Sequence, residues 1–193
     1  MDKLSLSPAT FLYPMPVVLA GALTGGKPNY ATIAYCGIAQ HSPPMISLAS
    51  NKNHYTNSGI RENGTFSINI PSEDMVEVTD FIGLNSWRVV DKSLLFETFY
   101  GSLKSAPMIK ECPLNLECRL VTTVDLKGIN ELFIGEIVGV YAEERYLTNG
   151  LPDITRIKPM VFSMHDNNYW KIGAHLAKAW SIGKAYRWKK PQD

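Results

Sequence analysis

Hydrophobic positions in the first fifty residues fall into runs that are separated by turn-forming residues. Pro16 to Leu23 and Tyr30 to Ile38 are apolar, and the six residues between them include two glycines and one proline. Apolar runs of this length, bounded by such residues, indicate β-strands joined as a hairpin. A Ser-Pro-Pro break at 42–44 introduces a third predicted strand, Met45 to Ala49.

Polar residues after position 50 change the pattern and predict a short helix. Thr56 suits the N-cap of this helix, which is expected to run through Glu62, and the Asn63-Gly64 pair suits its C-terminal end. A strand, Thr65 to Ile70, is expected next. A second helix should follow from Ser72 to about Gly83, because its first turn is acidic.

The second half of the chain contains the longest β-like runs. Leu114 to Leu126 and Glu131 to Tyr146 are rich in Val, Ile, Leu and Thr, and the turn-forming residues 127–130 join them as a hairpin. Ile157 to Met164 and Tyr169 to Ile172 are further candidate strands. Many strands with two short helices predict a mainly β fold, a closed or nearly closed antiparallel barrel.

Segments outside these runs have weaker patterns. Residues 85–93 hold three charged side chains and are expected to form an exposed stretch. An irregular lead-in over residues 1–15 is expected to pack on the barrel through Phe11, Leu12 and Tyr13. The basic tail is expected to pack by its aromatic residues, rather than to bind nucleic acid; these are Trp180, Tyr186 and Trp188.

The composition is that of an ordinary globular protein. The 193 residues are 45% hydrophobic and 19% charged, which predicts a single domain over 1–193 that needs neither disulfides nor metals. Nineteen basic against eighteen acidic residues leave a net charge of +1, so no global field attracts nucleic acid or a membrane surface. With no secretion signal and no membrane-length apolar run, a soluble cytoplasmic protein is expected.

Several common kinds of chemistry have no signature in this sequence. Three cysteines cannot all pair, which indicates a reducing compartment, and core packing is the favoured role of Cys36, Cys112 and Cys118. The four histidines lack the spacing of a metal site. Absence of the Gly-x-Gly-x-x-Gly fingerprint, the Gly-x-x-x-x-Gly-Lys-Ser/Thr loop and the Gly-x-Ser-x-Gly elbow argues against Rossmann oxidoreductases and hydrolases.

Small polar side chains follow the ends of the first three predicted strands, between Asn29 and Thr56. Because a helix N-terminus attracts anions, a phosphate could bind near Thr56, beside Ser50, Asn53 and His54. Helix capping alone is the simpler interpretation of Thr56. An apolar sheet with a polar rim would also suit a flat, phosphorylated cofactor such as a flavin.

Seven strings of residues, in order along nearly the whole chain, carry a resemblance to a known family. They are Pro14 to Leu19, Asn29 to Tyr35, Pro43 to Ala49, Gly64 to Pro71, Asp80 to Ser86, Asp91-Lys92 and Phe133 to Ile137, with the single residue Thr56 between the third and the fourth. Together they resemble the flavin reductase-like, FMN-binding split-barrel family, and within it the flavoredoxin and ferric-reductase-like branch. The ordered series is more specific than any single string.

The resemblance implies an antiparallel, Greek-key-like split β-barrel with short inserted helices, which binds FMN noncovalently near a homodimer interface. By position, the resemblance places Asn29, Thr32 and Tyr35 along the flavin, and Ala49 and Ser50 beside the ribityl chain. It places Asn53, His54 and Thr56 around the phosphate. Lys92 would approach the phosphate or the electron-rich edge of the ring.

Two positions depart from the pattern of the family. Asn130 stands where many relatives carry a histidine near the ring, so it keeps a hydrogen-bond donor but not a titratable one. Tyr35 stands where a tryptophan is common, and it retains an aromatic ring of smaller area. Phe162 is a further implied contact of the ring.

The function implied by the resemblance is electron transfer by an FMN-dependent oxidoreductase, flavoredoxin-like or flavin/ferric reductase-like. Because the flavin supplies the chemistry, no catalytic residue is assigned. One alternative is a NAD(P)H:flavin oxidoreductase that supplies reduced flavin to a partner monooxygenase. Another is a non-catalytic FMN-binding module. The electron donor could be NAD(P)H or a redox protein.

Overall fold

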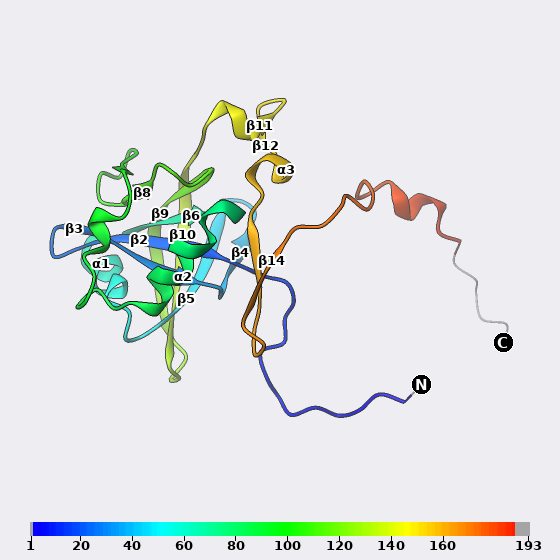
Figure 1. The fold of residues 1–193 in the computed structure, drawn as a ribbon, viewed down its shortest axis with the longest axis horizontal. Helices are drawn as coiled ribbons and strands as arrows, with labels where there is room; N and C mark the ends of the chain where they lie inside the picture. The colour runs from blue at the N-terminus through cyan, green and yellow to red at the C-terminus, as the bar shows by residue number, and fades with distance from the viewer. Residues whose placement is uncertain (1, 188–193) are drawn as a thin grey trace.

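A seven-stranded antiparallel sheet forms the centre of the computed structural model, which describes residues 2–187 (Figure 1). The strand order is β3-β2-β6-β9-β10-β5-β4. The strands are β2 (Val18–Thr24), β3 (Lys27–Ile33), β4 (Cys36–Gln40), β5 (Met45–Asn51), β6 (Thr65–Ile70), β9 (Leu114–Asp125) and β10 (Asn130–Ala142).

The two edge strands of this sheet, β3 and β4, are consecutive in the chain, and only Ala34 and Tyr35 lie between them. A link this short spans about 10 Å at most, so the sheet must curl until its edges approach each other. Across this junction the amide of Ala49 donates a hydrogen bond of 2.8 Å to the carbonyl of Tyr35. The expected mainly β, antiparallel barrel is therefore confirmed.

The first hairpin is present, with Val18 opposite Ile33 and Thr24 opposite Lys27. The prediction of a single returning strand over 30–38 is wrong, because the chain leaves β3 after Ile33 and continues as β4 at the opposite edge. Ile33 belongs to the main core and Cys36 packs against it. The apolar run therefore continues through the bend, and its periodicity cannot reveal where the strand breaks.

The longest hairpin, β9 and β10, was also predicted correctly, although β10 ends at Ala142 and residues 144–146 form a 3₁₀ turn. Its pairing register shifts between Ile134 and Gly135 and again between Ile137 and Gly139, as at β-bulges, which increase the local twist of a strand pair. A Cβ at Gly135 would overlap the ring of Phe66 in the core. Glycine therefore lets the long hairpin curve closely over the barrel interior.

Two short helices lie against the first hairpin: α1 (Thr56–Asn63) packs on β2, and α2 (Val76–Leu84) packs on β3. Gly64 ends α1 in the left-handed conformation, and its N–H donates to the carbonyl of Ile60, as expected. The prediction of Thr56 as the N-cap is wrong. Tyr55 occupies that position without a side-chain cap, and Thr56 is the first helical residue, its hydroxyl facing β3.

The remaining elements are short, and a second sheet, β1-β13-β14, flanks the barrel (Figure 1). They are β1 (Met15–Pro16), η1 (Glu73–Met75), η2 (Lys92–Leu94), β7 (Thr98–Phe99), β8 (Met108–Ile109), η3 (Glu144–Tyr146), β11 (Leu147–Thr148), β12 (Leu151–Pro152), α3 (Ile154–Ile157), β13 (Met160–Ser163), β14 (Asn168–Lys171) and η4 (Ile182–Ala185).

Two clusters of buried apolar side chains form the core. The larger fills the barrel around Leu48, Phe66 and Phe133, and the smaller lies between β3 and α2 around Tyr30 and Ile82. The predicted packing role of the cysteines is confirmed, because all three are free thiols that belong to these clusters or pack against them. Burial raises the pKa of the Cys36 thiol to about 12, so this thiol stays protonated.

Both chain ends leave the barrel on the side of β14 (Figure 1). The expected packing of the lead-in is wrong for Leu12, which is 79% exposed, although Phe11 contacts the ring of His165. The expected packing of the tail is wrong for Trp180 and Tyr186, which are exposed, and Trp188 lies outside the described residues. Among residues 2–187, no helix has both the length and the apolar character needed to cross a membrane.

Candidate functional site

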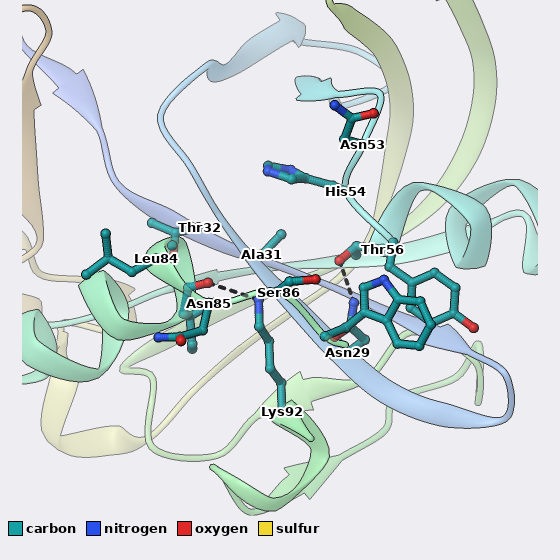
Figure 2. A pocket seen from close by; sticks show the side chains of 14 residues that line it. Asn29, Ala31, Thr32, Asn53, His54, Thr56, Leu84, Asn85, Ser86 and Lys92 are labelled. Atoms are coloured by element: carbon teal, nitrogen blue, oxygen red, sulfur yellow. Dashed lines mark hydrogen bonds between the residues drawn. The ribbon is translucent and has the colours of Figure 1, made fainter. Parts of the chain in front are cut away.

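A cavity of about 260 Å³ opens between β3, the start of α1 and the loop after α2 (Figure 2). We call it the Lys92 cavity. Asn29, Ala31 and Thr32 come from β3, residues 53–56 from the approach to α1, and residues 82–87 from α2 and its loop. Among the described residues, its lining contains Lys92 and His54 but no carboxylate. The Lys92 ammonium therefore makes this cavity suitable for an anion.

Within residues 2–187, Lys92 is the only lysine or arginine that lines this cavity, and its side chain is just 7% exposed. Its ammonium donates to the carbonyls of Tyr30, at 3.1 Å, and Ile82, at 2.9 Å. An ammonium has three N–H donors, so a third is left for a group in the cavity. Burial lowers the pKa of Lys92, because the charged form loses hydration.

Local hydrogen bonds explain how the loop after α2 places Lys92. The Ser86 carbonyl accepts from the amides of Val89, at 2.9 Å, and Val90, at 3.1 Å, which closes a turn. Asp91 then begins η2 by accepting from the amide of Ser93 at 3.1 Å. The expectation that the charged residues of 85–93 are exposed is wrong for Lys92, whose side chain reaches up into the cavity (Figure 2).

Asn29 and Thr56 join the sheet to α1 at the cavity wall. The Asn29 amide donates to the Thr56 hydroxyl at 2.9 Å, and both side chains are buried (Figure 2). Because Thr56 accepts here, its own O–H can donate to another group. The start of α1 therefore contributes a donor as well as the positive end of the helix dipole.

His54 points into the same cavity above Ala31 and Thr32 (Figure 2). Ser50 donates its hydroxyl proton to the Asn57 side-chain oxygen at 2.6 Å, so its oxygen accepts from Nδ1 of His54, 3.1 Å away. The neutral ring therefore carries its proton on Nδ1 and has a lone pair on Nε2. Burial and then the charge of Lys92 lower the pKa of His54, so both favour this neutral form.

A second cavity, of about 280 Å³, lies beside the first and shares Thr32 and His54 with it. We call it the Tyr35 cavity. Its wall includes Tyr35, Ala49 and Asn130, which come from three separate parts of the chain. Because the two cavities have these residues in common, they are adjacent, and an elongated ligand that reached both would be larger than either could hold.

The structure brings most of the residues predicted for the site to these two cavities. Ser50 is buried behind His54 and orients it without lining either cavity. Phe162 lies on β13, opposite Met15, and lines neither cavity. The residues that do line them are Asn29, Thr32, Asn53, His54, Thr56 and Lys92 in the first, and Thr32, Tyr35, Ala49, His54 and Asn130 in the second.

Sequence reasoning missed the aromatic part of the Lys92 cavity. Tyr55 and Trp87 line it, and their rings are stacked with centroids 3.7 Å apart and an interplanar angle of 18°. Asn85 and Ser86 were missed as well. No local pattern marks Tyr55 and Trp87, because they meet only when the loop after α2 folds over the start of α1. Ser86 ends one of the strings that carry the family resemblance, but it was not assigned to the site.

Comparisons with known proteins agree with one another. The family model described as flavin reductase like domain matches residues 10–166. A flavoredoxin structure from Methanosarcina acetivorans is 48% identical, with a TM-score of 0.92 over 95% of this chain and 98% of the other. A flavoredoxin of Desulfovibrio vulgaris is 35% identical, with a TM-score of 0.87 over 94% and 100%. An uncharacterized protein of Archaeoglobus fulgidus is 34% identical over 75% of this chain and 81% of its own.

Proposed function

Because this chain belongs to the flavin reductase-like domain family, we propose that it is an FMN-binding flavoprotein that transfers electrons. The family resemblance and the split-barrel fold expected from the sequence are confirmed by the match over residues 10–166 and by the similarity to two flavoredoxins. The family supports a flavin as the cofactor. FMN in particular, and the electron-transfer role, are our proposals.

The Lys92 ammonium is the observation that supports FMN most directly. It is a buried cation that uses two of its three N–H groups on protein carbonyls, in a cavity to which the described part of the chain contributes no carboxylate. A phosphate would satisfy the third N–H, and the low dielectric of the site would strengthen the attraction. The Thr56 hydroxyl and the Asn29 amide line the same cavity. These residues fit the phosphate of a flavin mononucleotide.

The Tyr35 cavity fits the flavin ring in this proposal. Tyr35 and Ala49 supply apolar wall, and the Asn130 amide can hydrogen-bond a polar ring edge. Thr32 and His54, which belong to both cavities, would contact the ribityl chain. When bound, FMN supplies hydride and one-electron transfer. The chain binds and orients it, and excludes water from it.

The direct test is to purify the protein and measure its flavin content and spectrum. We expect yellow protein that releases FMN on denaturation, or apoprotein that takes up FMN stoichiometrically. Lys92→Met should weaken FMN binding roughly tenfold to hundredfold through loss of a charge-assisted hydrogen bond. It should affect riboflavin, which has no phosphate, much less.

Lys110→Met is the matched control, because Lys110 is exposed and pairs with Glu97 at 2.6 Å, outside both cavities. It should leave the affinity for FMN unchanged. Colourless protein that binds no FMN would refute the proposal. If Lys92→Met lost affinity for FMN and for riboflavin equally, Lys92 would not be part of the phosphate site.

Anaerobic reduction distinguishes the two oxidoreductase roles. The electron carrier should hold FMN tightly and be reduced by a low-potential protein donor. A NAD(P)H:flavin oxidoreductase should instead consume NADH or NADPH steadily when free FMN or riboflavin is in excess. Following the flavin spectrum with NADH, NADPH and a ferredoxin-like donor in parallel therefore identifies the donor class.

A further inference from the structure

A third cavity, of about 260 Å³, lies beyond the Lys92 cavity at the β2–β3 turn. We call it the Lys27 cavity, after a lysine in its wall. It shares Asn29, Tyr55, Trp87 and Lys92 with the Lys92 cavity and no residue with the Tyr35 cavity. The shared residues therefore place the three cavities in a row, with the Lys92 cavity between the Tyr35 cavity and the Lys27 cavity.

Tyr55 and Trp87 stand at the boundary between the Lys92 and Lys27 cavities. Tyr55 precedes α1 and Trp87 follows α2, and their rings are in face-to-face contact with centroids 3.7 Å apart. The Arg88 guanidinium lies 5.8 Å from the centre of the Trp87 ring. A third aromatic ring between two others needs about twice the stacking distance. The Tyr55 and Trp87 rings therefore leave no room for another aromatic ring between them.

This geometry has a consequence for the flavin that the site accepts. In the proposed binding mode, the ring occupies the Tyr35 cavity and the phosphate ends at Lys92, against the Tyr55–Trp87 stack. A flavin dinucleotide carries a second phosphate and an adenosine beyond that point. The next space in line is the Lys27 cavity, on the other side of the stack.

The Lys27 cavity offers little to offset the cost of opening the stack. Lys27 is already paired with Asp91 at 3.0 Å, and hydrogen bonds from Ser93 and Lys27 hold the pKa of Asp91 at about 2. The carboxylate is therefore ionised and the pair carries no net charge. A second phosphate entering there would gain no free cation from this pair.

We propose that the Tyr55–Trp87 stack makes the site selective for flavin mononucleotides over flavin dinucleotides, because it blocks the path of the adenylate group into the Lys27 cavity. Trp87 and Tyr55 are then specificity-determining residues. This inference rests on the proposed function, because it takes the phosphate of the flavin to lie at Lys92.

The experiment measures the dissociation constants of FMN and FAD for apoprotein of the wild type and of Trp87→Ala. The wild type should prefer FMN. Trp87→Ala should reduce the ratio of the FAD constant to the FMN constant about tenfold, because the adenylate no longer has to open an aromatic stack. Tyr55→Leu removes the other ring and should change the ratio in the same direction.

Two control variants separate selectivity from a general loss of structure. Trp87→Phe keeps an aromatic ring and should retain the wild-type ratio. Val89→Ala alters an exposed side chain of the same loop that lines neither cavity, and should also retain it. The inference would be overturned if Trp87→Ala and Tyr55→Leu left the ratio of the two dissociation constants unchanged, whether or not both affinities fell equally. FMN binding by the wild type, and so the proposed function, would still stand. Absence of FMN binding by the wild type would instead refute the proposed function.

Discussion

The protonation state of His54 follows from the side chains that surround it. Ser50 gives its proton to Asn57 and accepts from Nδ1 of His54, which leaves Nε2 without a proton in the neutral ring. The Asn57 amide donates to the Asn51 carbonyl at 3.0 Å, which fixes the orientation of that amide. The lowered pKa of His54 means that this neutral, acceptor form is the one that folding favours.

We expect acid to destabilise the apoprotein through His54. Its pKa in the folded protein lies below the ordinary value of about 6.5, so below pH 6.5 the unfolded chain binds a proton that the folded chain does not. The contribution of His54 to the free energy of unfolding should therefore be fully present above the pKa that His54 has in the unfolded chain. It should be lost as the pH falls toward the lower pKa that His54 has in the folded protein. His54→Gln should flatten the resulting decline in stability, as measured by urea midpoints between pH 7.5 and 5.5.

His41→Gln is the control for this experiment, because His41 is exposed on the β4–β5 connection. This variant should follow the wild-type curve. Parallel curves for His54→Gln and the wild type would show that His54 does not titrate differently in the two states.

The helix α1 is attached to the barrel by buried polar and backbone contacts. Asn29 on β3 donates to the first residue of the helix, Thr56, and Gly59 lies against the carbonyl of Leu23 on β2. The position of α1 therefore depends on these close contacts with β2 and β3 rather than on capping of the helix N-terminus. Both attachments lie next to the residues that line the Lys92 cavity.

Thr56→Ala should destabilise the protein by about 1–3 kcal/mol, because the buried Asn29 amide loses its acceptor. Thr56→Ser keeps the hydroxyl and should cost much less. Urea unfolding without ligand measures both. A cost for Thr56→Ala within experimental error of zero would show that water or another group replaces the lost acceptor.

Gly59→Ala should also be destabilising, by about 1–3 kcal/mol or more, because its Cβ would overlap the carbonyl oxygen of Leu23. Gly128→Ala is the matched control, since nothing lies within 4 Å of a Cβ there. That surface change should remain within about 0.5 kcal/mol of the wild type. Thermal or urea unfolding of the two variants provides the comparison.

The molecule as a whole exposes apolar side chains along its two ends. Leu4 and Leu12 in the lead-in, and Leu176 and Trp180 in the tail, are each at least 79% exposed. Exposed apolar surface of this kind is typical of protein–protein contacts. We propose that a second copy of the chain covers these ends, which agrees with the homodimer implied by the family resemblance.

A combined Leu176→Glu and Trp180→Glu variant should dissociate the dimer at concentrations where the wild type is dimeric. Two buried carboxylates without partners would be costly in the interface. Sedimentation equilibrium measures the effect. Leu151→Glu, on the β11–β12 hairpin, is the control and should remain dimeric. A monomeric wild type at micromolar concentration would refute the proposal.

The sequence by itself determined the elements whose pattern is local. The strand Thr65–Ile70, the end of α1 at Gly64 and the β9–β10 hairpin were predicted because residue alternation and turn chemistry act over a few positions. The series of strings also identified the family. The phosphate site near Thr56, with Ser50, Asn53 and His54, was expected from the polar residues at a helix N-terminus. The other residues proposed for the flavin site came from the resemblance, since no short motif marks them.

Only the tertiary structure decided where the chain crosses between sheet edges and which side chains meet at the site. The break between β3 and β4 lies inside one apolar run, the burial of Lys92 depends on the carbonyls of Tyr30 and Ile82, and Tyr55 meets Trp87 across 32 residues. These features arise from contacts between distant segments, whose energies do not appear in any local pattern. The same contacts build the Lys92 cavity and the stack at its end.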